Sequence, residues 1–366
     1  MRASILLVRL VRLASSASLA CALQGCGAPP APAHVPAAPP ETTRAAVGDG
    51  AQQFAELGTC PLESGERIEG CRVGYRTFGK LDAARSNAIL FPTYFTGTTG
   101  DIAGVVPNKL VDTGRFYLIL VDALGDGVSS SPSNSKTQPR LRFPKFTTGD
   151  MVESQTRVLD SLGIQTLHAV MGISMGGMQA FAWGMRHPER VARVVSIVGT
   201  PQLTSQDLLL WSAELHALDS DVAYKNGEYE GRPQLRTVND LHALMLSTPA
   251  YRAQQTSREA FPAWMAEVEK STAFDWNDWH RQLEAMLAHD LFAPFGGSVT
   301  EAGNAWKPRA LVIVAEQDHM VSPLPSKAFA AATKAELVVL EGPCGHLSPN
   351  CETAKLSGAI AAFLAQ

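Results

Sequence analysis

The sequence has few charged residues and no excess of basic ones. Lysine and arginine total 31 against 35 aspartate and glutamate residues, which gives 366 residues a net charge of −4. This balance argues against nucleic acid as the main partner, because such binding needs a basic patch. No uncharged apolar run reaches the roughly 18 residues of a membrane-spanning helix. Hydrophobic residues make up 45% of the chain, which excludes a wholly disordered protein.

Acidic residues are missing from the start of the chain, where the first one is Glu41. The charged residues before it are three arginines, Arg2, Arg9 and Arg12. An uncharged stretch of small and apolar residues follows at 13–23. A basic start, a short apolar segment and a small-residue exit are typical of a secretory signal peptide. We therefore expect residues 1–25 to be a leader, whose removal would change the net charge from −4 to −7.

The end of this leader resembles a bacterial lipoprotein cleavage box. It reads Leu23-Gln24-Gly25-Cys26, in which Cys26 would be lipidated and become the new N-terminus. Leu19-Ala20-Cys21 is a competing site, and an ordinary signal peptide cut nearby is a further alternative. Residues 26–55 begin with prolines among alanines, so we expect an extended tether there. Such a protein would be anchored to a membrane through Cys26, in the periplasm or at the cell surface.

Cysteines with the spacing of a metal site are also missing. No two-residue Cys spacing or Cys/His cluster marks a zinc site, and we expect no metal and no cofactor. Beyond the leader, four cysteines form two local pairs, Cys60 with Cys71 and Cys344 with Cys351. Disulfides persist in exported proteins, so we expect this local pairing among the three that four cysteines allow. Four reduced thiols in a cytosolic enzyme are the alternative.

From about residue 71, short apolar runs alternate with helical patterns. The helical patterns lie at 148–162, 176–187 and 352–364. Several apolar runs are unbroken, as in strands that are covered on both faces of a parallel sheet. This rhythm predicts an α/β fold with a mostly parallel central sheet flanked by helices, built from residues 56–201 and 306–366. The expected strands are 73–78, 88–93, 117–122, 167–172, 194–198, 311–315 and 337–340.

The rhythm breaks between residues 202 and 305, where several helices are expected, at 205–217, 238–246 and 276–291. Ordinary helix packing is one interpretation of this stretch. The other, which we favour, is an inserted helical lid whose aromatic residues line a pocket. Four of the six tryptophans fall here: Trp211, Trp264, Trp276 and Trp279.

The strongest chemical signal is a G-x-S-x-G motif, Gly172-Ile173-Ser174-Met175-Gly176. It lies between an expected strand and an expected helix, which is the context of a nucleophile elbow. The turn leaves no room for side chains two residues before or after the serine, and Gly172 and Gly176 remove that clash. Ser174 would then stand at a helix N-terminus, where the dipole favours developing negative charge. A serine that only caps the helix is the alternative.

A serine hydroxyl needs a base, and elbow enzymes supply an acid and then a histidine later in the chain. Asp318 and His346 follow the last two expected strands, so both would lie at the sheet edge near Ser174. His346 would take the serine proton, and Asp318 would orient the imidazole. His319 and Glu316 are their nearest rivals.

The tetrahedral intermediate of acyl transfer needs two backbone N–H donors. One should be that of Met175, and the other that of Phe95, with Tyr94 next, in the loop after the expected strand 88–93. Cys344 is a poor alternative nucleophile because it lacks an elbow. If bonded to Cys351, it would instead clamp the loop of His346.

Four segments together resemble the homoserine O-acetyltransferases. They are Thr93-Tyr94-Phe95-Thr96-Gly97, Asp150-Met151-Val152, Gly172 to Ala180 (GISMGGMQA) and His187-Pro188-Glu189-Arg190-Val191. The resemblance runs from about Leu62 to the C-terminus. It implies an α/β-hydrolase fold with an inserted lid, and a triad that carries over as Ser174, Asp318 and His346. It also implies transfer of an acyl group from coenzyme A to a hydroxyl through an acyl-enzyme.

The sequence departs from this family where homoserine would bind. Leu347 follows His346, whereas the family has an aspartate that holds the substrate amino group. His242 and Thr248 stand near the positions of the family's arginine and tyrosine. A buried site without those partners should bind a charged amino acid poorly, and an exported enzyme meets little acetyl-coenzyme A.

These departures favour a serine hydrolase that acts on small esters. An O-acyltransferase that uses acetyl-coenzyme A is the first alternative. A binding protein on an inactive scaffold is the second. The expected partner is therefore a small-molecule ester, and a homodimer is compatible with the sequence.

Overall fold

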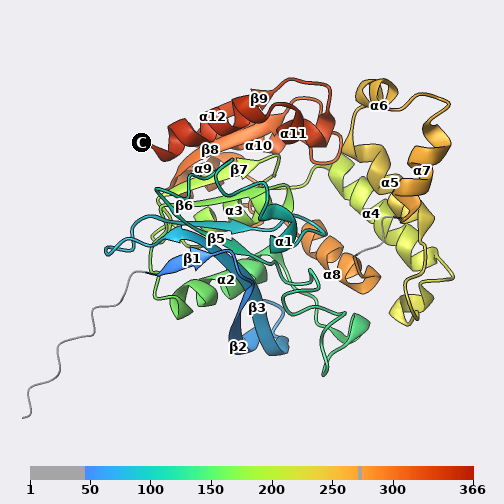
Figure 1. Cartoon of the computed structure of the whole chain (residues 1–366), viewed down its shortest axis with the longest axis horizontal. Helices are drawn as coiled ribbons and strands as arrows, with labels where there is room; N and C mark the ends of the chain where they lie inside the picture. The colour runs from blue at the N-terminus through green and yellow to red at the C-terminus, as the bar shows by residue number, and fades with distance from the viewer. Residues whose placement is uncertain (1–45, 271–273) are drawn as a thin grey trace, which may run out of the picture. The chain divides into compact units, whose positions relative to one another are not determined.

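The computed structural model describes residues 46–270 and 274–366. The expected leader, its cleavage box and Cys26 lie outside the described residues. The described chain folds around one nine-stranded sheet (Figure 1). Its strands are β1 (Val47–Asp49), β2 (Gln53–Pro61), β3 (Arg67–Lys80), β4 (Ala88–Pro92), β5 (Tyr117–Val121), β6 (Ala169–Ile173), β7 (Arg193–Ile197), β8 (Arg309–Ala315) and β9 (Glu336–Leu340).

The larger part of this sheet is parallel. The strand order is β1-β3-β5-β4-β6-β7-β8-β9, and all neighbours from β5 to β9 are parallel. β4 is buried along its whole length, with Leu90 in the core on one face and Ile89 and Phe91 in the core on the other. Burial on both faces explains the unbroken apolar runs. The predicted α/β class is confirmed.

Helices cover both faces of the sheet. Val152 of α2 (Thr148–Ser161) and Met178 of α3 (Met175–Arg186) belong to one core. Ile360 of α12 (Thr353–Leu364) belongs to the opposite core, and Figure 1 shows α2 and α12 on either side of the sheet. Shorter helices and single turns complete the body: α1 (Thr99–Ile102), α10 (Leu324–Thr333), α11 (Ser348–Cys351) and 3₁₀ turns at Arg140–Arg142, Lys225–Gly227, Ala293–Phe295 and Gly345–Leu347.

The N-terminal edge of the sheet corrects the expected tether. A tether over 26–55 is wrong for its last ten or so residues, because β1 pairs with the end of β3, Val47 opposite Lys80. β2 also starts inside that range and pairs antiparallel with β3. In β2 only Ala55 and Cys60 are buried, so this one-sided strand lacks the apolar run that marks the central strands. The apolar pattern also predicts only residues 73–78 of the longer β3.

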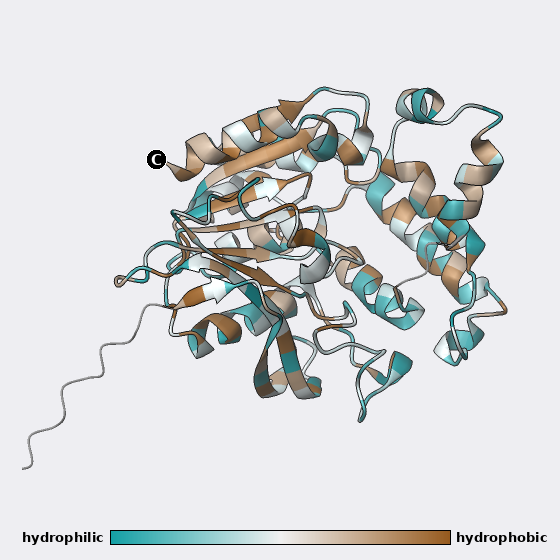
Figure 2. Cartoon of the chain, in the orientation of Figure 1, coloured by the Kyte–Doolittle hydropathy of each residue, from teal (hydrophilic) through white to brown (hydrophobic). Residues whose placement is uncertain are grey.

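A helical insert separates β7 from β8. Its interior is continuous with the core around α2 and α3, through residues such as Trp211 and Trp276. Figure 2 shows its helices carrying hydrophobic and hydrophilic residues side by side, whereas the central strands are mostly hydrophobic. The insert comprises α4 (Ser205–Ser220), α5 (Arg236–Leu246), α6 (Pro249–Gln255), α7 (Phe261–Lys270) and α8 (Trp276–Leu287), and α9 (Val299–Ala305) leads back to the sheet.

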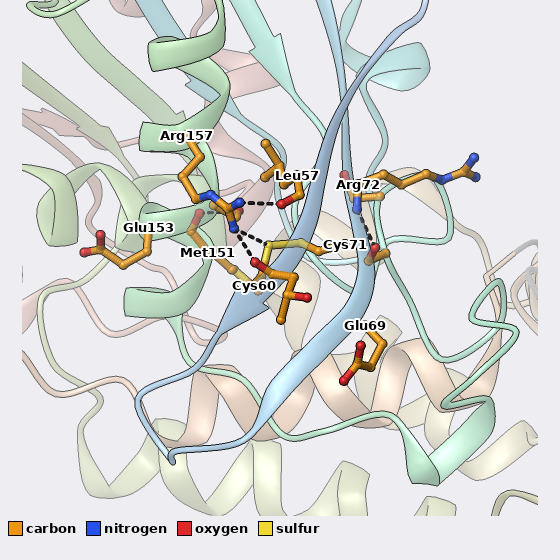
Figure 3. Close-up of a disulfide and its surroundings, with 12 residues drawn as sticks. Leu57, Cys60, Glu69, Cys71, Arg72, Met151, Glu153 and Arg157 are labelled. Carbon is orange, nitrogen blue, oxygen red and sulfur yellow. Dashed lines mark hydrogen bonds between the residues drawn. A yellow bond between two sulfur atoms is a disulfide. The ribbon is translucent and has the colours of Figure 1, made fainter. Parts of the chain in front are cut away.

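Both local cysteine pairs form disulfides. Cys60–Cys71 joins β2 to β3, and Arg157 of α2 donates hydrogen bonds to the carbonyl of Leu57 and to Cys60 Sγ beside it (Figure 3). Cys344–Cys351 closes a loop after β9. Within 46–270 and 274–366, no helix has the length and apolar character needed to cross a membrane.

Candidate active site

Ser174 occupies a sharp turn between β6 and α3. Its backbone has φ 55° and ψ −121°, a conformation that residues other than glycine rarely adopt. A Cβ atom on Gly172 would lie 2.1 Å from the carbonyl oxygen of Gly176, and one on Gly176 would lie 2.6 Å from that of Pro92. Only glycine fits at either position, so this turn has the geometry of a nucleophile elbow.

The three predicted polar side chains meet at this turn. His346 Nε2 lies 2.9 Å from Ser174 Oγ, and His346 Nδ1 lies 2.7 Å from Asp318 Oδ2. Asp318 follows β8 and His346 follows β9, whose carboxyl ends lie at the same sheet edge as the elbow. The histidine and aspartate side chains are 8% and 1% exposed, so water competes little for these hydrogen bonds.

The surroundings of Asp318 suit an ionised carboxylate. Its Oδ1 accepts the backbone N–H groups of Met320 and Val321, each at 2.9 Å, and its Oδ2 faces His346. The two rivals lie elsewhere: Glu316 pairs with Lys327 at the surface, and His319 is exposed. The acid that faces the imidazole is therefore Asp318.

The two backbone N–H groups predicted as oxyanion donors lie in the elbow and in the loop after β4. Met175 is the first residue of α3, and Phe95 lies in the loop after β4. Among the described residues, neither N–H donates to another protein group. The carbonyl of Pro92 approaches Gly176, so the β4 loop and the elbow are in close contact. Both donors are free to face a substrate oxygen.

A buried amide chain ties these two donor segments together. Gln179 Nε2 donates to the carbonyl of Thr93 at 3.1 Å and to that of Met175 at 3.2 Å. Its Oε1 accepts Gln155 Nε2 at 2.7 Å, and Gln155 Oε1 accepts the indole N–H of Trp183 at 2.7 Å. Gln179 is fully buried, so this chain fixes the spacing between the loop of Phe95 and the elbow.

The insert supports the same loop from the other side. Gln282 of α8 accepts the backbone N–H of Thr96 at 3.0 Å and donates to the carbonyl of Leu124 at 3.1 Å. Asp278, one turn earlier, accepts the N–H and the hydroxyl of Ser133. Burial, with Asp275 nearby, raises the pKa of Asp278 to about 8. α8 is therefore attached to the body by hydrogen bonds as well as by packing.

The loop that carries His346 is held at three points. The Cys344–Cys351 disulfide closes it, and Thr248 of the insert donates a hydrogen bond to the carbonyl of Pro343. Gly345 has φ 64°, and a Cβ there would lie 3.1 Å from the backbone nitrogen of Thr248. The family resemblance predicts Thr248 near a substrate-binding position, and the structure places it against this loop instead.

A pocket of about 390 Å³ opens beside Ser174 and His346. Its walls are largely apolar, and Leu347 is part of them. Trp211, His242 and Leu246 come from the insert, which therefore covers part of the site as a lid would. No lysine or arginine lines this pocket in the described part of the chain, and no described cluster of His, Cys, Asp or Glu could hold a metal ion.

Comparison with known proteins places the chain in a family. The model of the alpha/beta hydrolase fold matches residues 87–349. The chain belongs to the α/β-hydrolase family. A protein of Corynebacterium glutamicum named "Probable esterase" is 30% identical over 322 residues, which cover 81% of this chain and 90% of that protein. This α/β-hydrolase is thus an enzyme of the class that its sequence predicted.

Other relatives have transferase names, and the homoserine O-succinyltransferase of Ralstonia nicotianae is 29% identical over 377 residues, which cover 91% of this chain and 93% of that protein. The homoserine O-acetyltransferase of Geotalea daltonii is 38% identical over 193 residues, which cover 47% of this chain and 52% of that enzyme. The chain thus spans about half of that relative's length. Among solved structures, an acetylester hydrolase from Corynebacterium glutamicum has a TM-score of 0.80 at 25% identity, covering 86% of this chain and 96% of that one. This α/β-hydrolase therefore has both esterase and homoserine acyltransferase homologues.

Proposed function

We propose that this α/β-hydrolase is a serine esterase that hydrolyses small esters through an acyl-enzyme on Ser174. The observation that carries the proposal is the hydrogen-bonded chain from Ser174 Oγ through His346 to Asp318 beside an apolar pocket. A relative named as an esterase and a neighbour named as an acetylester hydrolase support the same reaction. The small pocket volume favours short acyl groups.

The proton moves between two atoms in this mechanism. His346 Nε2 takes the proton of Ser174 Oγ as the oxygen attacks the ester carbonyl carbon. The N–H groups of Met175 and Phe95 stabilise the oxyanion, and Nε2 then protonates the departing alcohol. Water next gives a proton to Nε2 and attacks the acyl-enzyme, and Nε2 returns that proton to Ser174 Oγ as the acid leaves. Asp318 keeps Nδ1 protonated throughout.

Acyl transfer to homoserine is the second candidate, because several relatives are named homoserine acyltransferases. The pocket argues against it. Leu347 supplies no charge for an amino group, and no described lining residue is a lysine or arginine that would pair with a carboxylate. The carboxylate of homoserine would lose its hydration there without a lysine or arginine to pair with it.

The test compares the two reactions in one assay. Purified protein is given acetyl-coenzyme A with homoserine, and separately p-nitrophenyl acetate. We expect rapid p-nitrophenol release that Ser174→Ala abolishes, and little O-acetylhomoserine by mass spectrometry. O-acetylhomoserine formed faster than free acetate would overturn the hydrolase assignment in favour of the transferase.

The enzyme functions outside the cytosol in this proposal. Its two disulfides support that location, since disulfides persist in oxidising compartments. Lipidation would occur at Cys26, and a Cys26→Ser variant should move from the membrane fraction to the soluble fraction of cells. Membrane association that is unchanged in Cys26→Ser would contradict the anchor.

A further inference from the structure

The pocket wall contains a second carboxyl–imidazole pair that the proposed mechanism does not use. His242 Nδ1 of α5 lies 3.2 Å from Glu214 Oε1 of α4. The glutamate side chain is 0% exposed, whereas the histidine side chain is 21% exposed and lines the pocket of Ser174. A buried acid behind a pocket-lining histidine fixes one ring nitrogen and leaves the other toward the pocket.

The carboxyl group of Glu214 has little support apart from this histidine. Its Oε2 is buried and has no hydrogen-bond partner among the described residues. Aromatic rings surround the imidazole, with centroids 5.1 Å away for Trp279 and 5.9 Å away for Phe95. An ionised carboxylate in such surroundings is costly unless a proton on its partner balances its charge. These surroundings favour a pair that is neutral overall.

The net charge of the pair decides whether Nε2 of His242 carries a hydrogen. If Glu214 is ionised, His242 is an imidazolium with a hydrogen on both nitrogens. If Glu214 is protonated on Oε1, its hydroxyl donates to Nδ1, and the neutral ring holds its hydrogen on Nε2. A proton on Oε2 would instead leave a buried hydroxyl without an acceptor, which is costly. In both arrangements Nε2 is a hydrogen-bond donor. No described residue accepts from it, so it is available to a molecule in the pocket.

We propose that His242 is a specificity residue, which donates a hydrogen bond from Nε2 to a substrate oxygen outside the ester group being cleaved. The preferred substrates are then small esters that carry an additional hydroxyl or ether oxygen. This inference rests on the proposed ester hydrolysis at Ser174.

The charges of the pocket favour a neutral oxygen over a carboxylate. A neutral pair of His242 and Glu214 adds no positive charge to the pocket, and Asp101 also lines it. A carboxylate would enter this pocket without a cation to pair with it, and that desolvation is expensive. A hydroxyl or ether oxygen needs only a donor. A site built around such a donor discriminates against the analogue that lacks the oxygen.

The test uses pairs of esters that differ by one atom. In 2-methoxyethyl acetate an oxygen replaces one methylene of butyl acetate, on the alcohol side. In ethyl methoxyacetate an oxygen replaces one methylene of ethyl butanoate, on the acyl side. Within each pair the ratio of the two kcat/KM values is measured. Differences in intrinsic reactivity cancel when the ratio of a variant is divided by that of the wild type.

The informative variant is the double replacement His242→Phe with Glu214→Gln. Replacement of the histidine alone would leave a buried carboxylate without its partner and endanger folding. Glu214→Gln alone keeps the imidazole and reports on folding of α4. His216→Gln is the matched control, because His216 is an exposed histidine of α4 outside the pocket. Thermal melting and fluorophosphonate labelling establish that each variant is folded.

We expect the double variant to lose about 3- to 10-fold of the preference for the oxygen-containing ester in one of the two pairs, the effect of one hydrogen bond. The control His216→Gln should keep the wild-type ratio. Unchanged ratios in both pairs for a folded double variant would overturn the inference while leaving ester hydrolysis intact. No hydrolysis of any of the four esters by the wild-type protein would overturn the proposed function, and this inference with it.

Discussion

The two carboxyl–imidazole pairs beside the pocket are built from the same chemical groups but have different surroundings. Asp318 receives two backbone N–H groups in addition to the imidazole of His346. Glu214 receives the imidazole of His242 and has an unpaired Oε2. The proposed base therefore lies beside a carboxyl group that the backbone supports, whereas the proposed donor lies beside one that its histidine alone supports.

The groups that support each acid therefore determine whether its histidine is suited to act as a base or as a hydrogen-bond donor. In our proposals His346 serves Ser174 as a base, whereas His242 serves the pocket as a hydrogen-bond donor. The pairs also differ in the secondary-structure elements that carry them. Asp318 and His346 follow strands of the sheet, while Glu214 and His242 lie on helices of the insert.

The largest expected effect separates the two histidines. His346→Gln removes the base, so kcat/KM for p-nitrophenyl acetate should fall by about 10⁴-fold or more. The double replacement His242→Phe with Glu214→Gln leaves the base in place and should lower the same value by less than about 10-fold. Comparable losses in the two variants, measured by p-nitrophenol release, would mean that the pairs are not functionally distinct.

The two acids should differ almost as much. Asp318→Asn disturbs the tautomer of His346 and should lower kcat by about 10³- to 10⁴-fold. Glu214→Gln should change kcat for the same ester by only about 3-fold or less, because its histidine does not act as a base. Steady-state kinetics on both variants check this, and a larger loss in Glu214→Gln than in Asp318→Asn would reverse the assignment.

Gln179 extends the contrast to the oxyanion donors. Gln179→Leu removes the bridge between the carbonyls of Thr93 and Met175, so the two N–H groups should lose their spacing. We expect kcat to fall by about 10- to 100-fold with little change in KM, somewhat less than the loss of one oxyanion donor. A merely structural role would lower the melting temperature and leave kcat of the folded fraction unchanged.

The two disulfides offer a matched comparison, because each closes a short loop but only one of them lies next to His346. Replacing both cysteines of either bridge by serine should lower the free energy of unfolding by about 2 to 3 kcal/mol. Only loss of Cys344–Cys351 should also lower kcat, because that bridge holds the loop of His346. The Cys60–Cys71 variant is the control. Urea unfolding and kinetics give the two readouts, and equal kcat values for both variants would contradict the clamp.

The smallest effect concerns attachment of the insert. Burial raises the pKa of Asp278 to about 8 in the folded protein, so between about pH 4 and pH 8 the folded state holds a proton that the unfolded state releases. This contribution to stability falls as pH rises through that window. Asp278→Asn should therefore show a smaller drop in melting temperature from pH 5 to pH 8. A drop as steep as that of the wild type would show that Asp278 is already ionised.

Local sequence patterns were enough to predict the central strands of the sheet and the pair of Asp318 and His346 that faces Ser174. Unbroken apolar runs marked the central strands, because those strands are buried on both faces. Ser174, Asp318 and His346 each follow a strand, and parallel strands bring their carboxyl ends to one edge. The two disulfides were predictable because each pair of cysteines is close in sequence.

The second pair and its surroundings were not predictable in the same way. Glu214 and His242 lie on separate helices, and helix packing brings them together without a sequence signal. Gln179 was part of a recognised motif, but its partner Gln155 lies on another helix. β1 and β2 lacked the apolar runs of central strands because they form a one-sided edge. These features depend on tertiary contacts.

Trapping the acyl-enzyme tests directly whether ester hydrolysis proceeds through Ser174. The protein is quenched with acid during turnover of p-nitrophenyl acetate and digested, and its peptides are analysed by mass spectrometry. We predict one added acetyl group on the peptide that contains Ser174. We also predict that acetate accumulates when the reaction is allowed to finish. Full turnover with acetylation at another residue, or sustained hydrolysis by Ser174→Ala, would contradict the claim.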